Sequence, residues 1–218
     1  MAKLDDTDLD LYLASASPRR RELLNQIGIR FEVIYGLEVD ESQHQAESPE
    51  QYVTRLACEK ALAGYFRIFP PVEARQLAMP PVLGADTCIA LDGEILGKPV
   101  DRDDGIAMLQ RLSGRSHKVL TAICLFDGKH ERHSLSQSVV SFKVLNLDEI
   151  ERYWESGEPV DKAGAYAIQG DAARFVTHLQ GSYTGVVGLP LTKRHRNPID
   201  QLRGRRYEPS TVRMCVWS

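Results

Sequence analysis

The segment LYLASASPRRRELL, residues 11–24, opens the pattern that decides the fold class of this chain. Leu11–Ala14 is a short apolar run with the character of a buried strand. Ser17 and Pro18 follow as an N-cap and a first helical position, and Arg19–Ile27 is predicted to be a helix that a glycine ends. A strand that passes through a tight loop into a helix is typical of a sheet covered by helices.

Outward from this segment, strands and helices alternate, and the dipeptides Asp92-Gly93 and Asp127-Gly128 mark hairpins in the middle of the chain. This combination predicts an α/β fold with a mixed sheet and helices on its faces, rather than a purely parallel sheet. Ser48 and Gln51 have the spacing of a capping box, which predicts the start of the second helix. Further helices are expected at 49–66, 101–112 and 147–156, and further strands at 31–35, 82–85, 88–91, 94–96, 117–126, 134–144, 175–179 and 186–189.

The composition excludes several classes of protein. The 218 residues are 43% hydrophobic and 26% charged, close to the average for globular proteins and enough for one core without disulfides or metals. A disordered tail protein, a collagen-like fibre and a disulfide scaffold are therefore excluded. The longest apolar stretches are strand-sized, so we expect no membrane partner. The N-terminal MAKLDDTDLD is acidic and does not resemble a signal peptide, which favours a cytoplasmic location.

The four cysteines, Cys58, Cys88, Cys124 and Cys215, lie far apart and form no CxxC pair. Without a secretion signal they are expected to be reduced thiols. Because metal clusters usually contain local pairs of ligands, we interpret these residues as packing residues rather than a zinc site.

Charge is unevenly distributed along the chain. The segment 192–218 has seven basic and two acidic residues, a net charge of +5, which leaves −8 for the first 191 residues. The acidic body argues against nucleic acid as a partner. The basic segment is either a nucleic-acid arm or an unstructured, solvated end, and the lack of helical periodicity together with Pro198 and Pro209 favours the second. We therefore expect one domain at 1–191 and a poorly ordered basic tail at 192–218.

Three consecutive arginines, Arg19–Arg21, stand in the first turn of the expected helix. Cations at the N-terminus of a helix interact unfavourably with the helix dipole, so their presence suggests a functional role. A helix N-terminus suits phosphates, and arginine adds planar, bidentate donors for phosphate oxygens. A simple basic surface is the alternative.

Two further residues could carry chemistry at the ends of short strands. Asp86 follows an apolar run, where α/β sheets place functional groups, and could orient a water or hold a divalent cation. A capping aspartate is the alternative. Lys98, between Gly97 and Pro99, could point at a phosphate, although the Walker motif GxxxxGK[ST] is absent. A solvated turn lysine is its alternative.

Lys60 and Gln169 have both a functional and a structural interpretation. Lys60 lies on the second helix and could reach into a cleft or only extend along the surface to solvent. Gln169 lies in a stretch rich in small residues that lets a ligand approach the backbone, and its amide could read a base edge or bond the loop backbone. No Ser-His-Asp set and no HExxH spacing is recognisable.

Taken together, these motifs resemble the Maf family of nucleoside triphosphate pyrophosphatases. Each is weak alone, but their order and spacing over about residues 9–191 are specific. The matching segments are LYLASASPRRRELL (11–24), EVDES (38–42), RLACEKA (55–61), VLGADT (82–87), LGKPVD (96–101), MLQRLSGRSHKVLTA (108–122), DKAGAYAIQG (161–170) and VVGLPL (186–191).

The resemblance implies hydrolysis of a nucleoside triphosphate between its α and β phosphorus atoms, which gives a monophosphate and pyrophosphate. It also implies a divalent cation, Mg²⁺ or Mn²⁺, and leaves room for a homodimer. The fold it implies is an elongated mixed sheet in two lobes with a central cleft, as in inosine triphosphate pyrophosphatase.

The resemblance also implies roles for individual residues. The residues expected to bind the phosphate chain are Ser15, Arg19, Arg20, Lys60 and Lys98. Asp86 would be the base that prepares the attacking water, and Asp40 or Glu41 would help to hold the metal. Arg19, Thr87 and Gln169 would set the base preference, and this trio resembles the dTTP and UTP subgroup rather than the 7-methyl-GTP subgroup.

The chain departs from the family after residue 191, where the family continues into an apolar-periodic helix. Here the sequence TKRHRNPIDQLRGRRYEPSTVRMCVWS has no amphipathic stripe, so an exposed apolar patch and reduced stability are expected. A non-catalytic nucleotide-binding regulator linked to septum formation and a nucleic-acid binder remain as alternatives. The presence of Asp86, Lys60 and Lys98 together favours the enzyme, since a binding module need not keep a base.

Overall fold

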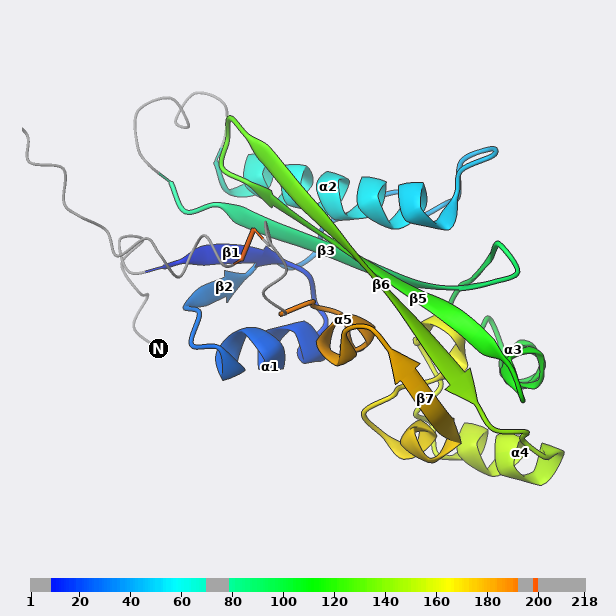
Figure 1. Cartoon of the computed structure of the whole chain (residues 1–218). Helices are drawn as coiled ribbons and strands as arrows, with labels where there is room; N and C mark the ends of the chain where they lie inside the picture. Colours follow the sequence, from blue (N-terminus) through cyan, green and yellow to red (C-terminus); the bar gives the residue numbers. More distant parts are fainter. Residues whose placement is uncertain (1–8, 70–78, 192–197, 200–218) are drawn as a thin grey trace, which may run out of the picture.

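The structure, a computed structural model, describes residues 9–69, 79–191 and 198–199. Within these ranges the chain forms an open, mixed sheet of seven strands with helices on both faces, which confirms the expected α/β fold (Figure 1). The strand order is β2-β1-β3-β5-β6-β7, and β4 pairs with β3 outside this path. The pairs β1–β2 and β1–β3 are parallel, and all other pairs are antiparallel.

The bounds of the elements follow the hydrophobic patterns closely. The strands are β1 (Leu11–Ala14), β2 (Phe31–Val33), β3 (Val82–Leu91), β4 (Glu94–Leu96), β5 (Ser116–Phe126), β6 (Glu131–Phe142) and β7 (Val176–Gln180). The helices are α1 (Pro18–Gln26), α2 (Pro49–Ile68), α3 (Arg102–Leu112), α4 (Leu147–Glu155) and α5 (Tyr183–Val187), with 3₁₀ turns at Ala163–Ala165 and Asp171–Phe175.

Helix starts follow local side-chain chemistry. At α2 the predicted capping box is present, because Ser48 Oγ accepts from the Gln51 amide at 3.2 Å and Gln51 Oε1 accepts from the Ser48 amide at 2.9 Å. At α1, Ser17 occupies the N-cap position and Pro18 begins the helix, as predicted, but the Ser17 side chain forms no cap hydrogen bond. The fixed φ of proline at the first helical position suits this start.

Alternation along the strands produces one core on each face of the sheet. Leu11 and Leu13 of β1 pack in the core beneath α1, α5, α3 and α4, whereas Tyr12 and Ala14 pack beneath α2. Figure 1 shows α2 on one side of the long β5–β6 hairpin and α1 and α5 on the other. In the same view β1, β2 and α1 gather toward one end of the sheet, and α3, α4 and β7 toward the other, which is the two-lobed form that the resemblance implied.

The contact between α2 and β3 depends on Gly84. A Cβ at this position would lie 2.1 Å from the carbonyl oxygen of Ala57 and 2.6 Å from the amide nitrogen of Ala61. Only glycine therefore lets the helix backbone lie directly on the strand. This close approach sets the distance between α2 and β3, and so determines where the side chains of α2 reach the sheet.

Two sequence predictions about elements were wrong. Residues 186–189, expected as a strand, form none: Val186 and Val187 end α5 and Gly188 is its C-cap. Ser182 caps the start of this helix by accepting a hydrogen bond from the Gly185 amide at 3.0 Å. A short apolar run cannot by itself distinguish a strand from a buried helix. The two runs 82–85 and 88–91 form one continuous strand, β3, so Asp86 lies in the middle of a strand rather than at its end.

Of the expected basic tail, the structure describes Pro198 and Ile199, and Ile199 is buried in the core beneath α1. The remaining tail residues lie outside the described ranges, so the boundary at residue 191 stays a prediction. No helix in the part of the chain that the structure describes combines the length and apolar character needed to cross a bilayer.

Candidate active site

The site forms where one edge of β3 lacks a neighbour. On this edge β1 pairs with β3 only as far as Ala14 opposite Gly84, and β4 begins to pair only at Ile89. The other edge is covered by β5 throughout. A cavity of about 880 Å³ opens beside the intervening residues and reaches from the β1–α1 loop to the segment after α4. The carboxyl end of a parallel strand such as β1 is where open α/β sheets place ligands.

The structure brings together all of the predicted site residues except Asp40. The cavity is lined by Ser15, Arg19, Arg20, Glu41, Lys60, Asp86, Thr87, Lys98 and Gln169, among others. The carboxylate of Asp40 is exposed and accepts a hydrogen bond from the Ser42 amide at 2.9 Å, within its own loop. Of the two acidic residues predicted to hold a metal, only Glu41 is therefore among those lining the cavity.

Lys60 joins two carboxylates at the α2 side of the cavity. Its Nζ atom lies 2.7 Å from Asp86 Oδ1 and 2.6 Å from Glu41 Oε1, with the side chains of Lys60 and Asp86 only 15% and 13% exposed. Lys98 lies at 4.0 Å from the second oxygen of Glu41. Burial raises the pKa of Glu41, but the hydrogen bond from Lys60 and the charges of Lys60 and Lys98 outweigh it and hold that pKa below its usual value.

The loop that carries Glu41 is held against α2 by backbone hydrogen bonds. Tyr52 donates its hydroxyl to the carbonyl of Glu41 at 2.9 Å, and Arg55 donates to the carbonyl of Ser42 at 2.9 Å. Burial, with the nearby charges of Asp86 and Glu41, raises the pKa of Tyr52 to about 12, so this hydroxyl stays a donor at neutral pH. Glu41 is thus placed by its backbone as well as by Lys60.

Arg20 lies on the opposite side of the cavity and is only 9% exposed. Its guanidinium donates to the carbonyl of Gly188 at 2.9 Å, to Ser15 Oγ at 2.8 Å and to Thr87 Oγ1 at 3.2 Å. These contacts use three of the five N–H donors of arginine and are all to neutral acceptors. Burial lowers the pKa of Arg20, and the nearby Asp86 opposes this effect.

Thr87 belongs to a directed chain of hydrogen bonds. Thr121 donates its single hydroxyl proton to the carbonyl of Gly185 at 2.7 Å, so in its 2.9 Å contact with Thr87 it accepts. Thr87 therefore donates to Thr121 and accepts from Arg20. The hydroxyl proton of Thr87 is therefore used in a hydrogen bond within the protein. The contact of Thr87 with Arg20 helps to hold the guanidinium in position.

Positive charge is in surplus around the part of the cavity near α1. Neither Arg19 nor Arg20 forms an ion pair with a carboxylate among the described residues, and Lys162 donates only to the carbonyl of Val160 at 3.1 Å. Burial lowers the pKa of Arg19, and burial together with the charge of Arg19 lowers the pKa of Lys162. A buried cation without a carboxylate partner is costly, so the site favours an anionic ligand.

Sequence reasoning missed several residues of the site, including Lys162, Tyr52 and Gly188. Lys162 stands in the segment 161–170 that the sequence motifs already single out, and its positive charge is the signal that could have found it. The buried position of Arg20 could have been anticipated, because Arg20 precedes the buried Leu23 and Leu24 by three and four positions and so shares their helix face. Tyr52 and Gly188 have no signal in a single sequence.

The carboxylates of the cavity fit a divalent metal ion. Asp86 and Glu41 both direct an oxygen at the same ammonium group of Lys60, so the two oxygens already converge on one cationic point. Oxygen ligands suit Mg²⁺ and Mn²⁺, and Mg²⁺ is commonly held by one or two carboxylates together with substrate phosphates. Asp40 does not contribute to this arrangement.

The cavity lies at the end of a parallel strand of an α/β sheet, with surplus cations on one side and paired carboxylates on the other. This arrangement is typical of a protein that binds a phosphorylated anion beside two carboxylates able to hold a metal ion. The sequence agrees with this class. The profile of the family described as Maf-like protein matches residues 10–197, and the chain belongs to this family.

Curated relatives are similar over most of the chain. The dTTP/UTP pyrophosphatase of Alkalilimnicola ehrlichii is 55% identical over 181 residues, which cover 83% of this chain and 87% of that protein. The dTTP/UTP pyrophosphatase of Aromatoleum aromaticum is 52% identical over 189 residues, covering 83% and 90%. That of Methylococcus capsulatus is 50% identical over 189 residues, covering 87% and 89%.

Proposed function

We propose that this chain is a nucleoside triphosphate pyrophosphatase that hydrolyses dTTP and UTP to the monophosphate and pyrophosphate. The observation that carries this proposal is Arg20, a buried guanidinium with no carboxylate partner among the described residues, which lines the same cavity as the Asp86–Lys60 pair. The names of the relatives support the substrate. The non-catalytic regulator is not favoured, because a binding module does not need a partly buried carboxylate held by a lysine.

The phosphate chain would lie between the two sides of the cavity. Arg19, Arg20 and Lys98 supply cationic donors, and Ser15 adds a hydroxyl beside Arg20. These groups compensate the charge of the bound triphosphate and the further charge that develops on the departing pyrophosphate. Arginine suits this role because its donors match phosphate oxygens in pairs.

Asp86 is proposed as the general base. A water held by Asp86 attacks the α-phosphorus, its proton passes to the carboxylate, and the bond from the α-phosphorus to the oxygen bridging to the β-phosphate breaks. Lys60, whose Nζ atom lies 2.7 Å from Asp86 Oδ1, holds this carboxylate in place before the proton is transferred. The monophosphate keeps the oxygen from water, and pyrophosphate leaves with the bridging oxygen.

Glu41 and Asp86 would hold the divalent metal ion that the family implies, Mg²⁺ or Mn²⁺. When bound, such an ion neutralises phosphate charge and polarises phosphoryl oxygens. Lys60, which contacts Asp86 at 2.7 Å, would also donate to an oxygen of the phosphate chain.

Base preference is proposed to depend on Arg19, Thr87 and Gln169. Gln169 is exposed on the cavity wall and has a donor and an acceptor available for a pyrimidine edge. Thr87 would act through Arg20, whose position it fixes. The expected homodimer and cytoplasmic location also stay proposals.

Pyrophosphate release from a panel of nucleotides tests this function. The panel contains dTTP, UTP, CTP, ATP, GTP and 7-methyl-GTP, each measured with Mg²⁺, with Mn²⁺ and with a chelator. We expect the highest kcat/KM for dTTP and UTP and no release in the chelator, because the phosphate charge is then uncompensated.

Two results would contradict the proposal at different levels. Equal or faster turnover of 7-methyl-GTP would refute the pyrimidine preference while leaving the reaction intact. No release from any nucleotide, with nucleotide binding retained in calorimetry, would refute the enzyme and support the non-catalytic regulator.

A further inference from the structure

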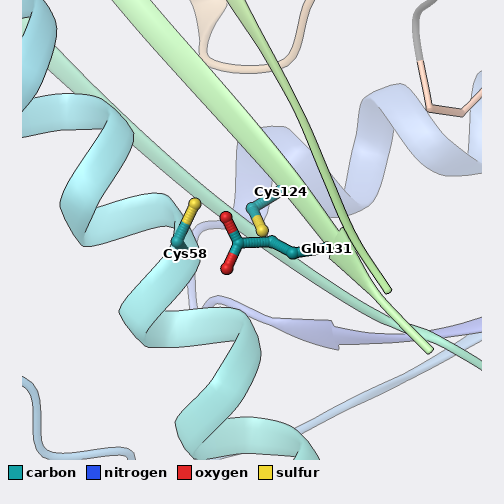
Figure 2. A group of neighbouring side chains, drawn as sticks. All are labelled: Cys58, Cys124 and Glu131. Carbon is teal, nitrogen blue, oxygen red and sulfur yellow. The ribbon is translucent and has the colours of Figure 1, made fainter. Parts of the chain in front are cut away.

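A second group of metal-ligating side chains lies outside the cavity. Cys58 of α2, Cys124 of β5 and Glu131 at the start of β6 place their ligand atoms within 4.8 Å of one another, and Figure 2 shows the carboxylate of Glu131 directed between the two sulfur atoms. None of the three lines the cavity described above. Spacing in the sequence favours packing roles for the cysteines, but the fold brings Cys58 and Cys124 together between α2 and the sheet.

The register of the sheet explains why these side chains meet. Cys124 faces α2, as its place in the core beneath that helix shows. In the antiparallel β5–β6 pair, Phe126 is opposite Glu131 and Cys124 is opposite His133. Directly opposed residues share a face of the sheet, so Glu131 and His133 both lie on the α2 side. The imidazole Nδ1 of His133 is 3.6 Å from a carboxylate oxygen of Glu131.

We propose that Cys58, Cys124 and Glu131 bind a thiophilic divalent cation such as Zn²⁺. His133, which contacts Glu131 but lies outside the group of three, would have to move inward to become a fourth ligand. Thiolate, imidazole and carboxylate are the ligands that zinc prefers. Zinc–sulfur bonds of about 2.3 Å in a tetrahedron place the two sulfur atoms about 3.8 Å apart, so the group needs to close by only about 1 Å.

The local charges also favour a cation. Glu131 forms no ion pair with a lysine or arginine of the described residues, and its carboxylate faces two thiols instead. The hydrogen bond with Cys124, burial and the charge of Glu131 all raise the pKa of the Cys58 thiol. A dication at this point would offset the repulsion among two thiolates and a carboxylate and would be bound with release of protons.

Binding would have a structural consequence. The three ligands belong to α2, β5 and β6, so one ion would fasten α2 to the sheet. Cys58 precedes Lys60 by two positions on the same helix. The proposed ion would therefore stabilise the position of the helix that carries Lys60. It is separate from the metal proposed for the cavity.

Titration of the purified, reduced protein with Co²⁺ tests the site, because cobalt bound to thiolates gives charge-transfer absorption that carboxylate sites do not. We expect this absorption to saturate at one equivalent per chain, to be displaced by Zn²⁺, and Zn²⁺ to raise Tm. Cys58→Ser and Glu131→Gln, at partly exposed positions that tolerate polar residues, should weaken binding by at least about tenfold, since even groups that only support ligands contribute that much. His133→Gln should weaken it as well.

Cys88→Ser is the matched control, since it removes a thiol that lies outside the group and should leave the titration unchanged. The proposal is overturned if the wild-type protein shows no thiolate absorption. It is equally overturned if Cys58→Ser and Glu131→Gln titrate like the wild type, or if Cys58 and Cys124 form a disulfide under reducing conditions. None of these outcomes depends on nucleotide hydrolysis, so this test and that of the proposed function can fail separately.

Discussion

Arg20 both connects separate segments of the chain and places a positive charge at the cavity. Its three hydrogen bonds reach Ser15 in the first loop, Thr87 in β3 and Gly188 after α5, so it joins three parts of the chain. Its charge, by contrast, is not balanced by a carboxylate partner among the described residues. A side chain that is tied by neutral acceptors and left with spare donors at a cavity wall is arranged for an anion.

Replacing Arg20 with lysine keeps the charge but removes the planar set of donors. Loss of hydrogen bonds to a charged ligand should raise KM for dTTP about 10- to 100-fold, which corresponds to about 1.5–3 kcal/mol. Steady-state pyrophosphate release measures this effect. Arg21→Lys, on the same helix but outside the cavity lining, is the control and should leave KM unchanged. An Arg20→Lys variant with the wild-type KM and Tm would contradict the role of Arg20 in binding.

At the scale of elements, the contact of α2 with β3 determines where Lys60 meets Asp86. The helix backbone touches the strand at Gly84, two residues before Asp86, and Lys60 stands next to Ala61, which makes that contact. A small change in the distance between α2 and β3 would therefore change the distance between Lys60 and Asp86.

Gly84→Ala should displace α2 because the added Cβ meets backbone rather than flexible side chains. Overpacking of this kind costs about 1–3 kcal/mol in the free energy of unfolding, and kcat should fall as Lys60 moves from Asp86. Denaturant unfolding and pyrophosphate release measure the two effects. Gly97→Ala serves as the stability control, because apart from its two chain neighbours no residue has an atom within 4 Å of the position that the added methyl group would take. Equal stability of Gly84→Ala and the wild type would show that α2 does not rest on the strand as described.

Local sequence signals predicted most elements because they act over a few residues. The Ser48–Gln51 capping box set the start of α2, and the Asp92-Gly93 dipeptide set the β3–β4 hairpin. The strand expected at 186–189 failed because an apolar run of four residues is too short for its periodicity to separate a strand from a helix. Asp86 was misplaced to a strand end because its polar character, together with Thr87, interrupts an apolar strand that is in fact continuous.

At the scale of the whole molecule, the candidate site could be predicted only in part. Motif resemblance selected residues from distant segments, and the fold brings all of them except Asp40 to one cavity. Whether Asp40 or Glu41 enters that cavity depends on the hydrogen bonds that Tyr52 and Arg55 make to the loop, which leave no local signal. Cys58 and Cys124 meet for a similar reason, since their contact follows from sheet register and helix placement.

The proposed reaction depends on Asp86, which activates water for attack on a nucleotide that the surrounding cations bind. Asp86→Asn tests it most directly, because asparagine keeps the shape and an oxygen acceptor for Lys60 but cannot accept the proton. Pyrophosphate release and nucleotide affinity are measured together for this variant and for Asp103→Asn, an exposed substitution on α3 that should match the wild type. We expect release by Asp86→Asn to fall at least about a hundredfold while Kd changes by less than about threefold. Wild-type release by Asp86→Asn would contradict it.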